Sequence, residues 1–164
     1  MADRQETTFD QLMEEHGPVL RAVLRHLCRR PQDVDDVWQD TAVRVWKSLR
    51  ERPWLRNPRA WLARIAYRAY VDHAARQPAT AEYGGFDAAD ESVPTAHDAA
   101  ALAERRLQVR QALDALPADL RAIIALHYTA GLSLRETAAA LDLPVGTVKS
   151  RLHAALNLLR REVE

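Results

Sequence analysis

One predicted helix near the carboxyl end of the chain carries residues that can bind nucleic acid. Its outward face comprises Gly146, Lys149, Ser150, His153 and Asn157. Lysine can neutralise a phosphate or reach a guanine edge, and serine, histidine and asparagine can address the edges of bases. A glycine lets the backbone approach a ligand closely. This combination at helical spacing predicts a surface that reads a DNA major groove.

Two short helices would hold that face in place. Ser133 and Glu136 have the S-x-x-E spacing of a capping box, and Pro144 stops the first helix and suits the start of the second. The predicted inner stripes are Leu134, Ala138 and Leu141, then Val148, Leu152, Ala155, Leu156 and Leu159. The pattern is that of a helix-turn-helix. The alternative is an amphipathic helical hairpin with a solvated face, which all-helical proteins often contain.

A second segment, residues 50–76, interleaves arginines with aromatic residues. They are Arg50, Arg52, Arg56, Arg59, Arg64, Arg68 and Arg76, with Trp54, Trp61, Tyr67 and Tyr70. Arginines hold phosphates, and aromatic rings stack on unpaired bases at roughly 1–3 kcal/mol each. Arginines interleaved with aromatic residues are better suited to binding melted DNA than a closed duplex. Trp61 falls on an inner helical stripe and is expected in the core, whereas Trp54 lies in a loop between prolines.

The N-terminal part predicts three helices. Apolar spacing gives the first, which can kink at Gly17-Pro18, and the second spans about residues 32–50. The third starts at Asn57-Pro58, an N-cap followed by proline at the first helical position.

The second of these helices begins with a cluster of acidic residues. They are Asp33, Asp35, Asp36 and Asp40. Acidic residues there complement the helix dipole, which is a sufficient structural explanation. A docking face for a basic partner is the other interpretation. A metal site is disfavoured because no histidine lies at ligand spacing among them.

The composition indicates a helical protein without disulfides. Of 164 residues, 48% are hydrophobic and only five are glycine. No apolar run is long enough to span a membrane, and residues 1–10 lack the apolar core of a signal peptide, so a cytoplasmic protein is expected. The single cysteine, Cys28, lies in an apolar helical pattern and is expected in the core. The sequence shows no Gly-rich phosphate-binding loop, no paired metal ligands and no nucleophile–base spacing. We therefore expect neither enzymatic activity nor a bound metal or cofactor.

Charge divides the chain into three segments although the net charge is zero. Residues 77–100 contain five acidic and no basic residues, two prolines and a Gly-Gly pair, and they show no sustained periodicity. They are predicted to form a flexible acidic linker between domains at 1–76 and 101–164. A plain tether is the simpler interpretation of this segment.

Three sequence blocks resemble one known family. The chain is similar to group 4 sigma factors, the extracytoplasmic function (ECF) branch of the bacterial sigma-70 family, in the blocks DVDDVWQDTAVRVW, NPRAWLARIAYRAYVDHAAR and LDALPADLRAIIALHYTAGLSLRETAAALDLPVGTVKSRLHAAL. The matching segments, 33–76 and 113–161, cover more than half of the chain. The segment PVGTVKSRL is specific for this family when L-x-x-L-P precedes it. The block W-L-x-R-I-A in the N-terminal half of the chain makes a chance match improbable.

The resemblance implies an all-α protein of two small helical domains that binds the clamp and flap regions of core RNA polymerase and directs it to promoter DNA. By similarity, the clamp would contact Asp36, Gln39, Asp40 and Arg44. The −10 element would be recognised and melted by Arg52, Trp54, Arg56, Asn57, Arg59, Arg64, Tyr67 and Arg68, with a flipped base held beside the 50–57 loop. The −35 element would be read by Gly146, Thr147, Lys149, Ser150, Arg151, His153 and Asn157.

The same resemblance implies an anti-sigma partner and a path for the acidic linker toward the active-site cleft and RNA exit path, as a mimic of RNA charge. Three positions depart from the family pattern: Ala42 where an aromatic is frequent, Arg68 where asparagine is frequent, and Ala154 where arginine is common. The main alternative function is a stand-alone helix-turn-helix regulator. In such a protein the arginine- and aromatic-rich segment 50–76 would have no function. An enzyme is the second alternative, which no sequence feature supports, and a helical adaptor that binds only protein is the third.

Overall fold

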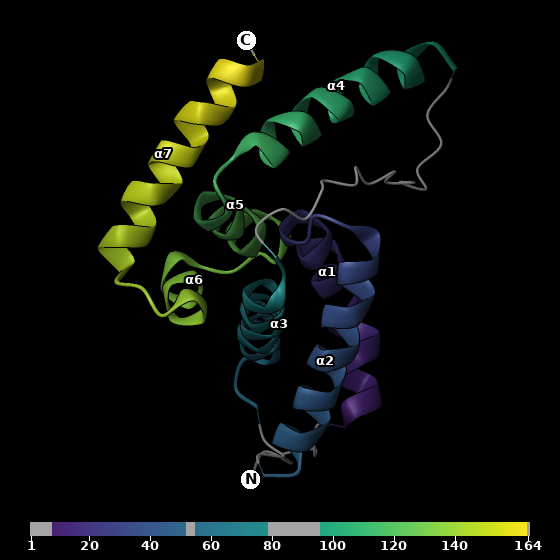
Figure 1. Ribbon diagram of the computed structural model, residues 1–164, viewed down its shortest axis with the longest axis vertical. Helices are drawn as coiled ribbons and strands as arrows, with labels where there is room; N and C mark the ends of the chain where they lie inside the picture. Colours follow the sequence, from purple (N-terminus) through teal and green to yellow (C-terminus); the bar gives the residue numbers. More distant parts are fainter. Residues whose placement is uncertain (1–7, 52–54, 79–95, 164) are drawn as a thin grey trace, which may run out of the picture.

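Helices account for all the regular structure in the described part of the chain. The computed structural model describes residues 8–51, 55–78 and 96–163. In chain order the elements are α1 (Phe9–Leu27), α2 (Pro31–Leu49), α3 (Pro58–Arg76), α4 (Ala96–Ala115), α5 (Ala118–Ile124), the π-helical turn η1 (Ala125–Thr129), α6 (Leu134–Leu141) and α7 (Val145–Val163). None of the described helices is both long and apolar enough to cross a bilayer. The all-α prediction is confirmed (Figure 1).

The helices α1, α2 and α3 pack side by side as a bundle (Figure 1). A capping box of Thr8 and Gln11 starts α1, which continues unbroken past Pro18. The predicted N-cap is confirmed, because the Asn57 side chain accepts a hydrogen bond from the Ala60 backbone N–H. The bundle core consists mainly of Leu12, Leu20, Val23, Leu24, Leu27, Val34, Val37, Val45, Leu49 and Leu62. These caps and stripes fix the position of the polar face of α3.

The predicted helix-turn-helix is confirmed at α6 and α7. Ser133 and Glu136 form both hydrogen bonds of the capping box. The first helix ends at Leu141, three residues before Pro144, because Asp142 adopts a left-handed conformation with φ 53° and caps it. Val148 and Ala155 of α7 are fully buried, so the predicted inner stripe faces the core.

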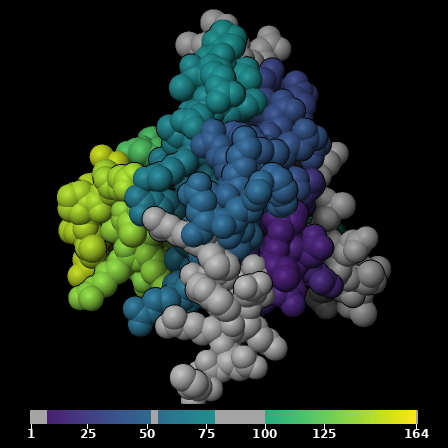
Figure 2. Space-filling view, turned by 90° about the horizontal axis from the view of Figure 1, so that it is seen from below, coloured from purple at the N-terminus to yellow at the C-terminus, as the bar shows by residue number. Residues whose placement is uncertain are grey.

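The two halves of the chain share one buried core. Residues from η1 to α6 join the cluster built by the first three helices, namely Ala125, Leu126, Ala130, Leu132 and Ala140. Contacts run between α3 and α6, between α1 and η1, and between α1 and α5. In Figure 2 the yellow-green atoms of the helix-turn-helix lie directly against the blue and teal atoms of the bundle. The free chain is therefore closed on itself.

The helix α4 begins earlier than the sequence pattern suggested. It starts at Ala96, inside the segment 77–100 that was expected to be a linker. The run AHDAAALAERR is rich in alanine, the strongest helix former, and this preference outweighs the absence of an amphipathic pattern. Residues 79–95 lie outside the described residues. The domain boundaries 1–76 and 101–164 and the linker between them remain a proposal.

Cys28 is buried, with 6% of its surface exposed, as predicted for a core residue. Burial, together with the nearby Asp33 carboxylate, raises the pKa of its thiol to about 12. Because the thiolate is the reactive form, we expect the native protein to resist iodoacetamide at pH 8 and to react at once in denaturant. Mass spectrometry of the alkylated protein would check this. Rapid alkylation of the native chain would contradict it.

Candidate nucleic-acid interface

The outward face of α7 is accessible along its first three turns. Gly146, Lys149, Ser150 and His153 are exposed, and Asn157 is half-buried. A methyl group added at Gly146 would meet no atom within 4 Å, so the backbone there is open to a close-lying ligand. The Ser150 hydroxyl donates to the Thr147 carbonyl at 3.0 Å, which leaves its oxygen free to accept a further hydrogen bond.

Arg151 lies off this face. With 3.6 residues per turn it points about 140° away from Gly146 around the helix. Its guanidinium pairs with the Asp119 carboxylate of α5 at 3.4 Å. The arrangement therefore brings together Gly146, Lys149, Ser150, His153 and Asn157, while Arg151 is turned toward the body of its own domain and the half-buried Thr147 lies at the edge of the face.

A second polar surface lies along α3. Arg56, Asn57, Arg59 and Arg68 are exposed, and Arg64 is half-buried. Arg52 and Trp54, also predicted for this surface, lie outside the described residues. The spacing of residues 64 and 68, one helical turn apart, places their guanidinium groups side by side. The surface can hold phosphates, as the sequence predicts.

Tyr67 does not lie with these arginines. It packs against the shared core, and burial raises the pKa of its phenol, with the nearby carboxylate of Asp119 as a lesser cause. Trp61 is half-buried against the same core, in agreement with its predicted inner position. Its half-buried ring is less accessible to a base than the exposed arginines of the same helix.

A hollow of about 400 Å³ lies beside the loop that joins α2 to α3. Its lining comprises Ser48, Glu51, Trp61, Arg64, Ile65 and Arg68. It combines an aromatic ring with arginines and a carboxylate, which are the groups that stack on and hydrogen-bond to a nucleobase.

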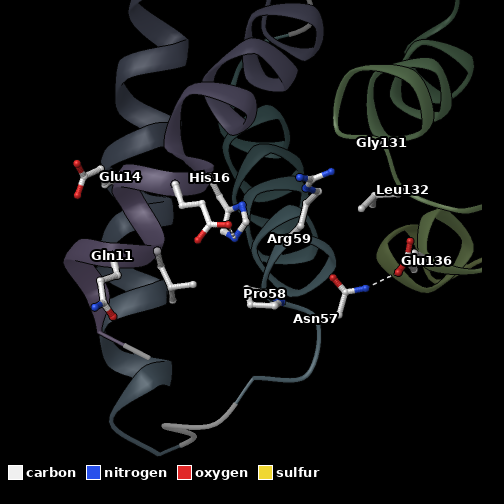
Figure 3. Close-up of a pocket in the computed structure, with 11 residues that line it drawn as sticks. Gln11, Glu14, His16, Asn57, Pro58, Arg59, Gly131, Leu132 and Glu136 are labelled. Carbon is white, nitrogen blue, oxygen red and sulfur yellow. Dashed lines mark hydrogen bonds and ion pairs between the residues drawn. The ribbon is translucent and has the colours of Figure 1, made fainter. Parts of the chain in front are cut away.

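The α3 surface faces α6 across a larger cleft. Gln11, Glu14 and His16 of α1 line one wall, and Arg59 of α3 lines another with Asn57, the N-cap of that helix. Gly131, Leu132 and Glu136 close the cleft, whose volume is about 860 Å³ (Figure 3). The Asn57 amide donates a hydrogen bond to the Glu136 carboxylate. Arg64 and Arg68 both pair with Asp142, at 3.0 and 3.2 Å.

Comparison with known proteins identifies both halves. The family model for sigma-70 region 2 matches residues 12–80, and the model for sigma-70 region 4 matches residues 106–159. The chain is 32% identical to the ECF RNA polymerase sigma factor SigL of Mycobacterium tuberculosis over 91% of this chain and 85% of SigL. It is 33% identical to the RNA polymerase sigma factor CnrH of Cupriavidus metallidurans over 94% and 85% of the two chains.

The chain belongs to the ECF branch of the sigma-70 family.

Solved sigma-factor structures share this fold. The structure of CnrH in complex with the cytosolic domain of CnrY matches with a TM-score of 0.63 and 30% identity, over 93% of this chain and 85% of CnrH. The sigma factor RpoE in complex with the anti-sigma factor NepR from Bartonella quintana matches with a TM-score of 0.77 and 24% identity, over 94% and 96%. In this ECF factor α1–α3 thus correspond to region 2, and the second half of α4 together with α5–α7 to region 4.

Region 2 of this ECF factor presents a mixed polar and apolar face on α2. Asp36 and Gln39 are exposed, and Asp40 is half-buried. Arg44 pairs with Asp40 at 2.8 Å and with Asp72 of α3 at 2.7 Å, so it ties two helices together. These are the four residues predicted for the polymerase clamp.

Two apolar residues on that face lie outside the predicted inner stripe and were not among the predicted site residues. Val43 is 49% exposed and Trp46 is 51% exposed, and the Arg50 guanidinium lies 5.3 Å from the Trp46 ring centre. A signal was present in the sequence: the two residues follow Asp36 and Gln39 by seven positions, off the inner stripe. Two large apolar side chains one helical turn apart, exposed together on one face, are typical of a protein-binding surface.

The acidic start of α2 has a structural role. Asp33 accepts two hydrogen bonds from Arg30, at 2.9 and 2.8 Å, and lies 3.1 Å from His73 of α3. The Arg30 hydrogen bond lowers the pKa of the Asp33 carboxyl against the opposing effect of burial. Asp33, Asp36 and His73 offer ligand atoms within 4.8 Å of one another, but the buried carboxylate among them already has its partners. The contacts of Asp33 with Arg30 and His73 therefore hold the start of α2 against the end of α3.

Proposed function

We propose that this protein binds core RNA polymerase and directs it to promoters whose −35 and −10 elements it recognises. The observation that supports the proposal is the presence of two separate exposed polar surfaces on one chain, the outward face of α7 and the arginine face of α3, in segments that match region 4 and region 2. A stand-alone helix-turn-helix regulator is not favoured, because that function does not account for the segment that matches region 2. The protein acts by binding, without catalysis of its own, in the cytoplasm where the polymerase works.

Each surface has its own part in promoter recognition. We assign the −35 contacts to Gly146, Thr147, Lys149, Ser150, His153 and Asn157, with Arg151 joining them once its guanidinium leaves Asp119. We assign −10 recognition and melting to the α3 surface, with Arg52, Trp54 and Tyr67 joining it in the open complex. The hollow beside the α2–α3 loop suits a flipped base, because it offers a ring for stacking and charged groups for hydrogen bonds.

The protein partners that we propose are inferred from those of similar sigma factors. The clamp of core polymerase would lie on the Asp36–Gln39 face of α2, and the flap on region 4. CnrH is found with the cytosolic domain of CnrY, and RpoE with the anti-sigma factor NepR. We therefore propose that an anti-sigma factor also holds this chain inactive. The acidic segment 77–100 would run through the polymerase where RNA otherwise lies, as a mimic of its charge.

Transcription in vitro tests the function directly. The purified chain, added to core polymerase and a library of double-stranded genomic fragments, should start transcription at discrete sites that share spaced −35 and −10 motifs. Core polymerase alone provides the control. Absence of binding to core polymerase in a pull-down would refute the proposal.

Substitution of Lys149 tests how region 4 contacts DNA. If its ammonium neutralises one phosphate, Lys149→Ala should weaken binding to every −35 duplex and lower the slope of log affinity against log salt by about one. Fluorescence anisotropy over a salt series measures this slope. A loss restricted to one base position would show instead that Lys149 reads a base edge.

A further inference from the structure

We propose that a Zn²⁺ ion binds region 2 where the start of α2 meets the end of α3. Its ligands are one carboxylate oxygen each from Asp33 and Asp36 and the Nε2 atom of His73, and these three atoms lie within 4.8 Å of one another. The two aspartates are one helical turn apart on α2, whereas the histidine comes from α3. The inference goes beyond the proposed function, because it concerns the folded chain alone and involves neither polymerase nor DNA.

The spacing between the histidine and the buried aspartate suits tetrahedral coordination. His73 Nε2 lies 3.1 Å from Asp33 Oδ1. Two ligand atoms that each lie about 2.0–2.1 Å from a tetrahedral zinc ion are about 3.3–3.4 Å apart. These two atoms therefore need to separate only slightly to hold one ion between them. Asp36 is exposed, so its carboxylate can close over the ion from the solvent side and water can take the fourth position.

The hydrogen bonds around His73 leave one neighbour unsatisfied unless a cation is present. Arg30 Nη2 donates to Gln77 Oε1 at 2.9 Å, so the amide nitrogen of Gln77 is the atom that faces His73, at 3.2 Å from Nε2. An amide nitrogen only donates, and an ionised carboxylate such as Asp33 only accepts. Because Nε2 carries either a proton or a lone pair, it can satisfy one of these two neighbours but not both. A zinc ion would accept a lone pair from Nε2 and from Oδ1 together.

Arg30 can stay beside the site when the ion binds. Its Nε donates to Asp33 Oδ2 at 2.9 Å, and its Nη2 donates to Asp33 Oδ1 at 2.8 Å and to Gln77 Oε1 at 2.9 Å. Only the hydrogen bond to Oδ1 competes with the ion. The bond from Nε to Oδ2 is the kind of outer contact that orients a metal-ligating carboxylate. Binding of the ion therefore costs Arg30 one hydrogen bond and leaves the other two in place.

The donor set favours zinc over magnesium or calcium. An imidazole nitrogen together with carboxylate oxygens suits Zn²⁺, whereas Mg²⁺ and Ca²⁺ bind through oxygen atoms. The side chains of His73 and Asp33 are 17% and 9% exposed, which shields the ion from most of the surrounding water. The exposed Asp36 marks the path by which the ion enters.

Isothermal titration calorimetry of the tag-free full chain with zinc chloride tests the site. One ion should bind per chain. His73→Ala should weaken the binding by about 100-fold or more, since outer-shell partners alone are worth about 10–100-fold. Asp36→Asn should weaken it by at least about tenfold for the same reason. Asp35→Asn is the matched control and should leave the affinity unchanged, because Asp35 lies on α2 between the two ligands but pairs with Arg21 of α1 at 3.5 Å.

Thermal melting provides a second readout. An ion that binds only the native chain stabilises it, so free Zn²⁺ at about 100 times its dissociation constant should raise the melting temperature by roughly 5–11 °C. Magnesium chloride at the same concentration should not raise it. Asp36→Asn should melt like wild type without zinc, because Asp36 is exposed, and should lose most of the increase with zinc.

Two results would overturn the proposal. One is the absence of zinc binding to the wild-type chain, and the other is equal affinity in Asp36→Asn and Asp35→Asn. If His73→Ala fails to fold, which circular dichroism would reveal, the comparison of the two exposed aspartates still decides. Failure of the chain to bind core polymerase would refute the proposed function and leave the zinc titration unchanged.

Discussion

Substitution of Trp46 by alanine should lower the affinity for core RNA polymerase by about 30-fold or more. Its indole is half exposed in the free chain, beside Val43 and the polar residues Asp36 and Gln39 on one face of α2. Tryptophans that become desolvated at the centre of an interface commonly contribute 2 kcal/mol or more to binding. The Arg50 guanidinium over the ring restricts its rotamers before binding, which reduces the entropy lost on association.

Surface plasmon resonance with immobilised core enzyme would measure the loss. Val71→Ala provides a matched control, because Val71 is an apolar residue on α3 with 43% exposure and no assigned contact. Both variants should melt within about 1–2 °C of wild type, since neither side chain is buried. Equal losses of affinity in the two variants would show that the α2 face has no special role.

Features set by neighbouring residues could be predicted from the sequence. The Ser133–Glu136 capping box and the Asn57 N-cap depend on residues three positions apart, and the predicted stripe through Val148 depends only on helical period. For the same reason the exposed face of α7 follows from the sequence. The end of α6 is harder to predict. The sequence pattern indicates Pro144 as the residue that stops the helix, whereas the helix ends at Leu141 because Asp142 adopts a left-handed conformation.

Features that depend on residues distant in sequence could not be predicted. Asp142 is separated from Arg64 by 78 positions, and His73 from Asp33 by 40. No periodicity encodes such pairs, since they arise only when the helices have packed. The orientation of Tyr67 has the same origin: its aromatic character suggested stacking on bases, and the packing of region 4 against α3 places it at the shared core instead.

Leu126→Ala should reduce the free energy of unfolding by about 2–5 kcal/mol, the usual range for a buried leucine truncated to alanine. Leu126 has no exposed surface and belongs to the same buried cluster as Leu20 and Leu24 of α1, although it lies on η1 in region 4. The cavity would therefore open where the two halves meet. The melting temperature should fall by roughly 4–20 °C, because each kcal/mol is worth about 2–4 °C in a domain of this size.

Differential scanning calorimetry can separate a shared core from two independent ones. Leu158→Ala is the control, since Leu158 is a leucine of α7 with 38% exposure and should cost less than about 1 kcal/mol. If the halves share a core, wild type should melt in one transition that Leu126→Ala shifts as a whole. A wild-type transition in two steps, of which Leu126→Ala moves only one, would show that region 2 and region 4 are stable independently.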